Sequence, residues 1–385
     1  MLIIYIPILM VVQLVCKNTY LNSGSHINTG ETEIPFPLQS CKMKYFQYEI
    51  IACLFIYLLS ASPVLADHKQ TVLSDGMKAG PAFSNPDYIE PMDKNWQNQP
   101  IRYKKLPENT DLAITLDQHL YVALLPLINQ FAKQHKLNIA VQEGTCGISA
   151  GSLYDKKVDM GGFCCPASET DRLPGLLFHT MAIASLAIIT HPQNKVNNIS
   201  LIQARQIFNG GLGYFSELSS NDKNNNQQED ELLIKPYTRM HCKLRPGHWR
   251  LLLNTEDDFS PIITELSTIN DMIKQVATNK DAIGYETLWM MEKYSQNGKV
   301  TYLNIDNISP ADNQALLKAK YPFYRTYNIT SWAPKHLAKP DIKKLITYLM
   351  DNFKLIKSKY GLISATQLRK NGWKFKGDEL IGEPE

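Results

Sequence analysis

The strongest constraint on the fold is an alternation of strand-like and helix-like segments that begins near residue 111. Residues 111–115 (DLAIT) and 138–142 (NIAVQ) are short apolar runs bounded by polar residues, which is typical of buried strands. Between them, residues 120–135 carry apolar side chains at the three- and four-residue spacing of a helix. A further strand-like run, residues 158–161, ends in a glycine turn. This alternation predicts an α/β fold with a parallel sheet.

The later chain supplies a second group of strands and helices. The apolar run within residues 177–190 is predicted to be a buried central strand, and residues 282–286 (AIGYE) a returning strand. At 385 residues the chain is long enough for two lobes, each with its own core. We expect the chain to cross between lobes near Ser185 and again near Gly284, so that residues 110–184 plus 285–385 form lobe 1 and residues 185–284 form lobe 2.

Composition and charge exclude some classes of protein. With 44% hydrophobic and 20% charged residues, the chain has the composition of a folded globular protein. The net charge of +3 is small, and no helix carries a basic stripe interleaved with aromatic residues. We therefore expect no nucleic acid partner, and a monomer whose ligand is determined by a local site.

The N-terminal region predicts export. After Met43 and Lys44 comes the apolar run 50–59, and then a small-residue segment that ends at Ala66. This order is typical of a signal peptide. We interpret residues 43–66 as the signal and residues 1–42 as an over-extended start. Residues 67–109 are then a polar, extended leader, and the mature protein lies in the periplasm or another extracytoplasmic compartment. An uncleaved anchor with two short spans is the alternative.

Three loops that follow predicted strands carry all the cysteines of the mature chain. A glycine-rich stretch with Gly144 and Gly147 contains the first of them, and a glycine turn at 161–162 precedes the next two. In doubly wound α/β lobes, ligands bind beyond the carboxyl ends of the strands. We therefore expect these loops to converge on one interlobe cleft; their cysteines are Cys146, Cys164, Cys165 and Cys242.

The order of motifs resembles that of the periplasmic phosphate-binding protein family, the substrate-capturing subunits of ABC importers. The similarity lies in the glycine-hydroxyl loop with residues 157–161 (KVDMG), the helix 198–210 that ends in IFNG, Arg239 with its glycine turn, and the strand 282–285 (AIGY). The resemblance implies a type II two-lobed α/β fold with two mixed or parallel sheets and a cleft between the lobes. It also implies a solute-binding protein, not an enzyme, that captures a phosphate-like oxyanion and works with an ABC permease.

Departures from the family pattern leave the ligand open. The family's S-G-T loop here reads Pro246-Gly247-His248, and thiols, which are weak hydrogen-bond donors, occur in each loop. If the loops bind an oxyanion, their hydroxyls, thiols and cations would contact it. The candidate ligand-binding residues are Thr145, Cys146, Ser149, Cys164, Cys165, Arg239, Cys242, Lys243, Arg245 and His248.

Two other interpretations of the cysteines stay open. As a soft-ligand site, the thiols would bind a soft metal, a redox cofactor or a thiophilic oxyanion, with Cys146, Cys164, Cys165, Cys242 and His241 as donors. As disulfides, they would pair Cys146 with Cys164 and Cys165 with Cys242. We expect no cofactor on the oxyanion interpretation. Catalysis by Cys242 and His241 is disfavoured, because neighbouring residues of a strand point to opposite faces.

Overall fold

A computed structural model describes residues 82–218, 232–239, 252–253, 258–353, 356 and 362–385. The expected signal peptide and its cleavage after Ala66 lie outside these residues, as do His241, Cys242, Lys243, Arg245 and His248. The chain divides into two compact units, residues 1–68 and 69–385, and the description below concerns the second unit alone. Among its described helices, none combines the length and the apolar character needed to cross a membrane.

The predicted parallel βαβ arrangement is confirmed at the start of this unit. Strand β1 (Leu112–Asp117) lies between β2 (Ile139–Gly144) and β3 (Met160–Phe163) and is parallel to both. Helix α5 (Gln118–His135) connects β1 to β2 and keeps Pro126 within its length, and α6 (Cys146–Tyr154) connects β2 to β3. The carboxyl ends of all three strands therefore meet at one edge of the sheet.

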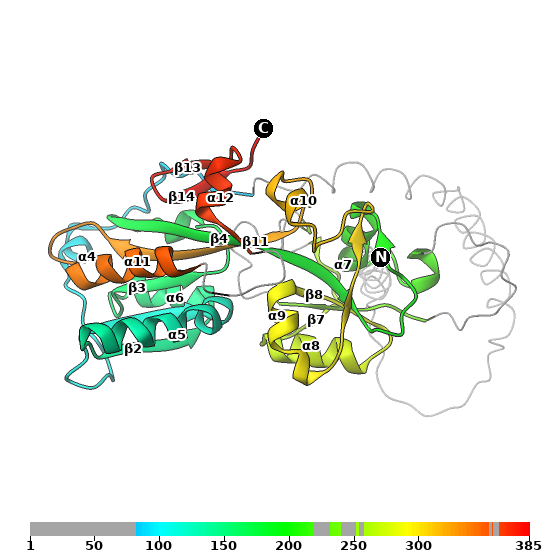
Figure 1. Cartoon of the computed structure of the whole chain (residues 1–385), viewed down its shortest axis with the longest axis horizontal. Helices are drawn as coiled ribbons and strands as arrows, with labels where there is room; N and C mark the ends of the chain where they lie inside the picture. Colours follow the sequence, from blue (N-terminus) through cyan, green and yellow to red (C-terminus); the bar gives the residue numbers. More distant parts are fainter. Residues whose placement is uncertain (1–81, 219–231, 240–251, 254–257, 354–355, 357–361) are drawn as a thin grey trace, which may run out of the picture. The chain divides into compact units, whose positions relative to one another are not determined.

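One long strand joins the two expected sheets into a single hydrogen-bonded sheet. Strand β4 (Leu176–Thr190) has 15 residues and spans about 50 Å when extended. Its first ten residues pair antiparallel with β11 (Tyr324–Trp332), and its last five pair antiparallel with β8 (Ala282–Thr287). The mixed sheet therefore runs β2-β1-β3-β11-β4-β8-β6-β7 (Figure 1), rather than as two separate sheets. The reason is that β4 is long enough to belong to both groups of strands.

Three strands of the second group, β6, β7 and β8, are also parallel to one another. Strand β6 (Lys235–Thr238) is parallel to β8 and to β7 (Thr264–Glu265). Helix α7 (Leu201–Asn209) begins at a capping box formed by Ser200 and Gln203 and ends at Gly210, whose φ of 82° favours glycine. The helix expected within residues 198–210 is therefore present, but it begins at Leu201, because Asn198–Ile199 form strand β5. Helix α8 (Ile269–Thr278) packs its apolar face on β8, and α9 (Leu288–Lys293) follows β8 directly.

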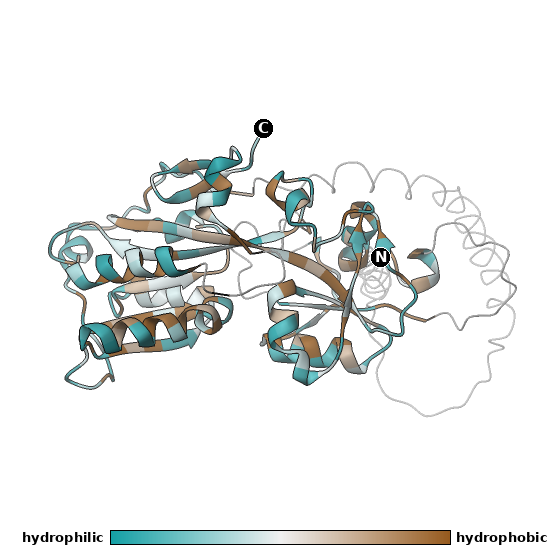
Figure 2. Ribbon diagram, viewed as in Figure 1, coloured by the Kyte–Doolittle hydropathy of each residue, from teal (hydrophilic) through white to brown (hydrophobic). Residues whose placement is uncertain are grey.

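Buried apolar side chains fall into three clusters on the faces of the sheet. The first lies under α5, α8 and α11 (Pro340–Asn352), and the second under α7 and the strands near it. The third fills the space between α6, β3 and Trp96 of the short helix α4 (Lys94–Asn98), and it contains Cys146, Cys164 and Cys165. Figure 2 shows the apolar stripe of α5 beside the strands.

Smaller elements complete the described chain. Strands β9 (Thr301–Tyr302) and β12 (Leu362–Ser364) pair with β4, β5 (Asn198–Ile199) pairs with β10 (Asn304–Ile305), and β13 (Lys374–Lys376) pairs with β14 (Glu379–Gly382). The remaining helices are α10 (Asn313–Leu317), α12 (Ala365–Lys370) and 3-10 turns at Glu169–Asp171, Phe215–Leu218 and Ser295–Asn297.

Candidate functional site

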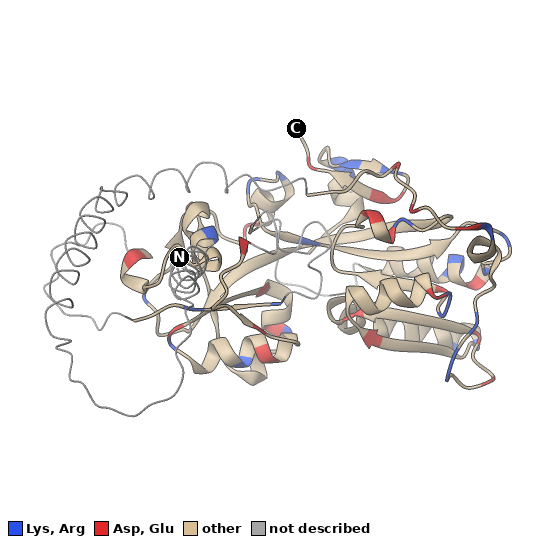
Figure 3. Cartoon of the chain, turned by 180° about the vertical axis from the view of Figure 1, so that it is seen from behind, with Lys and Arg blue, Asp and Glu red and all other residues tan. Residues whose placement is uncertain are grey.

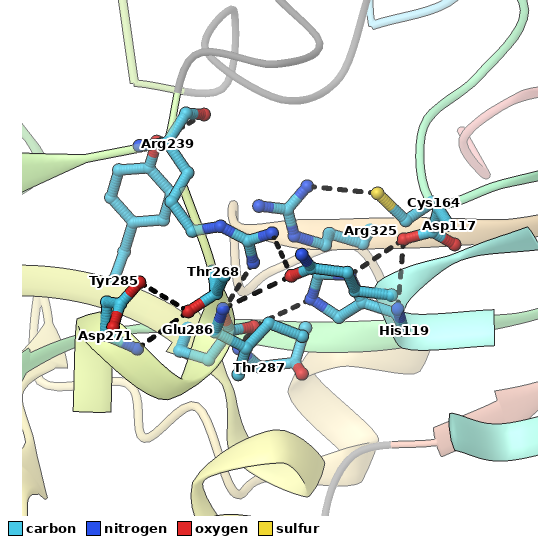
Figure 4. A network of polar contacts seen from close by, with 12 residues as sticks. Asp117, His119, Cys164, Arg239, Thr268, Asp271, Tyr285, Glu286, Thr287 and Arg325 are labelled. Carbon is cyan, nitrogen blue, oxygen red and sulfur yellow. Dashed lines mark hydrogen bonds and ion pairs between the residues drawn. The ribbon is translucent and has the colours of Figure 1, made fainter. Parts of the chain in front are cut away.

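Polar side chains from the carboxyl ends of two groups of parallel strands, β1 with β3 and β6 with β8, meet in one buried network (Figure 4). Asp117 is the last residue of β1, Cys164 follows β3, Arg239 follows β6 and Glu286 lies one residue before the end of β8. This is the edge at which ligands bind in open α/β sheets. The topology therefore places the candidate site here.

His119 bridges two carboxylates at the centre of the network. Its Nδ1 lies 3.0 Å from Oδ2 of Asp117, and its Nε2 lies 2.8 Å from Oε1 of Glu286. An imidazole donates from both nitrogens only when it is protonated. Burial by itself lowers the pKa of His119, but the negative charges of Glu286 and Cys164 and the hydrogen bond to Asp117 raise it well above its ordinary value. The two carboxylate contacts and the raised pKa both favour the protonated form of the ring.

The two carboxyl groups beside His119 differ in their ionisation. Burial raises the pKa of Glu286, but His119, Arg239 and Arg325 together lower it to about 2. For Asp117, burial and then the charge on Cys164 raise the pKa to about 6, although His119 opposes the rise. Glu286 is thus a fixed negative charge at neutral pH, whereas Asp117 changes its charge in mildly acidic solution.

Arg239 connects the first group of strands to the second. Its guanidinium donates from Nη1 to Oε2 of Glu286 at 3.2 Å and from Nη2 to Oε1 of Gln118 at 2.7 Å. Its backbone N–H donates to the Tyr285 hydroxyl at 3.0 Å. Among the described residues, no partner accepts a hydrogen bond from Arg239 Nε, although that atom is buried. Of the predicted cations, Arg239 is the one within the described chain, and it lies in the network.

Arg325, the second residue of β11, brings a second guanidinium to the site. It is only 2% exposed, and its Nη1 lies 3.5 Å from the sulfur of Cys164 and 3.8 Å from that of Cys165. A positive charge beside a thiol favours the thiolate form. Figure 3 shows residues of both charge signs distributed over the described elements.

The structure brings Cys146, Cys164 and Cys165 together and buries all three. Sγ of Cys146 lies 3.5 Å from Sγ of Cys164, which lies 4.0 Å from Sγ of Cys165. A disulfide requires about 2.05 Å, so the expected bond between Cys146 and Cys164 is not present in this structure. The backbone N–H of Cys164 donates to Cys146 Sγ at 3.3 Å, which holds the two sulfurs in contact. The expected pair of Cys165 with Cys242 lies outside the described residues.

The two predicted hydroxyls make bonds within the chain. Thr145 caps α6, and its Oγ1 accepts the backbone N–H of Ile148 at 3.2 Å. Ser149 is buried and donates to the carbonyl oxygen of Thr115 at 3.1 Å. Both residues therefore position the amino-terminal turn of α6, which carries Cys146.

Sequence reasoning missed four members of the network: Asp117, His119, Glu286 and Arg325. For Asp117, Glu286 and Arg325 the available signal was local: a charged side chain at the end of, or inside, an otherwise apolar strand. His119 lies at the start of α5 and has no such signal. A buried ion needs a compensating charge, so such residues predict a partner, but the partner's identity depends on the strand order.

The chain is similar in sequence to a protein named as a phosphate-binding protein. No family model matches the chain. The phosphate-binding protein PstS of Bacillus subtilis is 25% identical over 237 residues, which cover 60% of this chain and 73% of that protein.

Among solved structures, an ABC-type phosphate transport receptor from Vibrio cholerae is 19% identical, with a TM-score of 0.53. A putative phosphate ABC transporter substrate-binding protein with bound phosphate from Clostridium perfringens is 16% identical, with a TM-score of 0.52. Each match covers 66% of this chain and 99% of the other. The chain therefore has the predicted type II periplasmic-binding-protein fold, with a mixed sheet and flanking helices.

Proposed function

The chain is a divergent relative of the phosphate-binding proteins of ABC transporters, and on that premise we propose that it is a solute-binding protein that captures a phosphate-like oxyanion. Its role is binding without covalent chemistry: the ligand is held beyond the carboxyl ends of the strands and then released to a permease. The B. subtilis relative is named as a phosphate-binding protein, and the charge arrangement of this chain supports an anion of that class.

The observation that carries the proposal is the position of Arg239 in a buried network that also contains Arg325 and His119. Arg239, Arg325 and protonated His119 face two carboxyl groups, of which Asp117 is protonated below about pH 6. Arg239 also retains a buried Nε without a hydrogen-bond partner among the described residues. Guanidinium groups bind tetrahedral oxyanions through paired, charge-assisted hydrogen bonds.

Binding of inorganic phosphate to the purified protein tests this proposal. Equilibrium dialysis with labelled phosphate should show one saturable site, and Arg239→Gln should weaken it by about 10- to 100-fold, since a hydrogen bond to a charged group contributes about 1.5–3 kcal/mol. Arg369→Gln is the matched control, because Arg369 is exposed on α12 and bonds to Asp378 and the Gly377 carbonyl, away from the network. Equal affinities in wild type and Arg239→Gln would refute the assignment of Arg239, and no binding at millimolar phosphate would refute the proposed ligand.

The proposal extends to the compartment of the protein, its oligomeric state and its partner. We propose export through the signal at residues 43–66, a mature chain that begins at Asp67, and a monomer that delivers its ligand to an ABC permease. N-terminal sequencing of the exported protein tests the first two statements, since a first residue before Met43 would contradict them. Light scattering of the exported protein tests the monomer.

A further inference from the structure

The three described thiols have the geometry of a ligand set. Cys146, Cys164 and Cys165 are all buried, and their sulfur atoms lie within 4.8 Å of one another. The two closest pairs are separated by 3.5 and 4.0 Å. With a metal–sulfur bond of about 2.3 Å, two thiolates on one metal lie about 3.8 Å apart at a tetrahedral angle and about 4.0 Å apart at a trigonal angle. The observed separations are close to these values, so little movement would be needed to bind a metal.

The surroundings of the sulfurs favour their ionised form. Cys146 is the first residue of the nine-residue helix α6, where the helix dipole stabilises negative charge. Its sulfur accepts the backbone N–H of Cys164. Arg325 places one guanidinium nitrogen near the sulfurs of both Cys164 and Cys165. A metal complex with three thiolates has a net negative charge, and the guanidinium compensates part of it.

The donor set distinguishes among soft metals. Structural zinc almost always takes four ligands, and this set offers three. Soft thiolate donors also select Cu(I). His119 is near Cys164, but both of its nitrogens are hydrogen-bonded to carboxylates, so it does not supply a fourth donor in this arrangement. We propose that Cys146, Cys164 and Cys165 form a three-coordinate site for a single Cu(I) ion, beside the proposed anion site, with which it shares Arg325. Binding releases the thiol protons to solvent and changes no oxidation state.

Titration of the reduced protein with Cu(I) under anaerobic conditions tests the proposal. The protein should remove one Cu(I) ion per chain from a coloured chelator, and Cys146→Ser or Cys165→Ser should weaken binding by at least about 100-fold, the upper range found for loss of supporting residues around a metal. Met160→Leu is the matched control, because it replaces a buried sulfur of β3 that belongs to a different apolar cluster. Its Cu(I) affinity should equal that of the wild type.

Alkylation of the wild-type protein provides a readout that does not depend on the folding of any variant. With Cu(I) bound, the peptides that contain Cys146, Cys164 and Cys165 should be protected from iodoacetamide, and without Cu(I) they should react when the protein is opened by mild denaturant. Equal alkylation with and without Cu(I), or protection of Cys242 but not of the other three, would overturn the proposal. So would retention of wild-type affinity in the serine variants. Phosphate binding and Cu(I) binding are measured separately, so failure of one proposal is distinguished from failure of the other.

Discussion

Removal of the charge on Glu286 should destabilise the protein strongly. Glu286 is fully buried and accepts hydrogen bonds from His119 at 2.8 Å, from Arg239 at 3.2 Å and from the Thr287 backbone N–H at 2.7 Å. Glu286→Gln keeps the shape of the side chain but leaves two buried cations with less compensation. A hydrogen bond to a charged group contributes about 1.5–3 kcal/mol and a neutral one about 0.5–1.5. Loss of a buried ionic partner costs about 3–5 kcal/mol. We therefore expect about 3 kcal/mol of destabilisation near pH 6.

The effect should depend on pH in a way that the pKa shifts determine. The pKa of Glu286 is lowered to about 2 in the folded protein, so its contribution is present above its unfolded pKa of about 4.3 and is lost as the pH falls toward 2. The pKa of His119 is raised well above its ordinary value. Its contribution is therefore complete below about pH 6.5 and is lost as the pH rises through the folded pKa. The difference between wild type and Glu286→Gln should be largest between about pH 4.5 and 6.5.

Urea unfolding at a series of pH values measures this difference. With a slope of about 3 kcal/mol per molar urea, the midpoint should fall by about 1 M near pH 6. Coincident transitions by fluorescence and circular dichroism are needed before free energies are compared. Glu292→Gln is the matched control on the neighbouring helix α9, where the side chain is exposed, and its effect should stay within about 0.5 kcal/mol. A difference below about 1 kcal/mol, or one that is constant from pH 3 to 9, would refute the reasoning.

Three further predictions concern single elements. Ser200→Ala should destabilise the protein by about 0.5–2 kcal/mol, because Ser200 Oγ accepts the Gln203 backbone N–H at the start of α7. Urea unfolding measures this difference, and an unchanged midpoint would contradict the capping role. Gly284→Ala should lower the free energy of unfolding by about 1–3 kcal/mol, because the new Cβ would lie 2.4 Å from Met272 Sδ. A double variant with Met272→Ala should show a non-additive effect, and strict additivity would refute the clash. The folded pKa of Asp117 is raised to about 6, so the wild type should lose stability as the pH rises from about 4 to 6. Asp117→Asn should not show this loss. Identical pH profiles of the two proteins would contradict this.

Local sequence patterns were enough to predict the helices and strands and their order. The apolar spacing of α5, the capping box at Ser200 with Gly210 at the end of α7, and the alternation of strands and helices depend on residues within about four positions of one another. These signals do not require knowledge of the partner strand. They were therefore enough to predict the α/β class. The two-lobed fold and the expectation that Arg239 lies at the site came from the family resemblance.

The contacts between side chains of the network follow from strand order and could not be predicted from local patterns. His119 contacts Glu286 across 167 positions, and Arg325 reaches Cys164 across 161, because β11 and β8 both pair with β4. Strand order and register control these contacts, and neither follows from local periodicity. The same long-range packing buries the thiols against α6 and β3, where the sequence predicted that they would line a cleft. A charge inside an apolar strand shows that a buried ion must have a partner, but the folded sheet alone determines which residue that partner is.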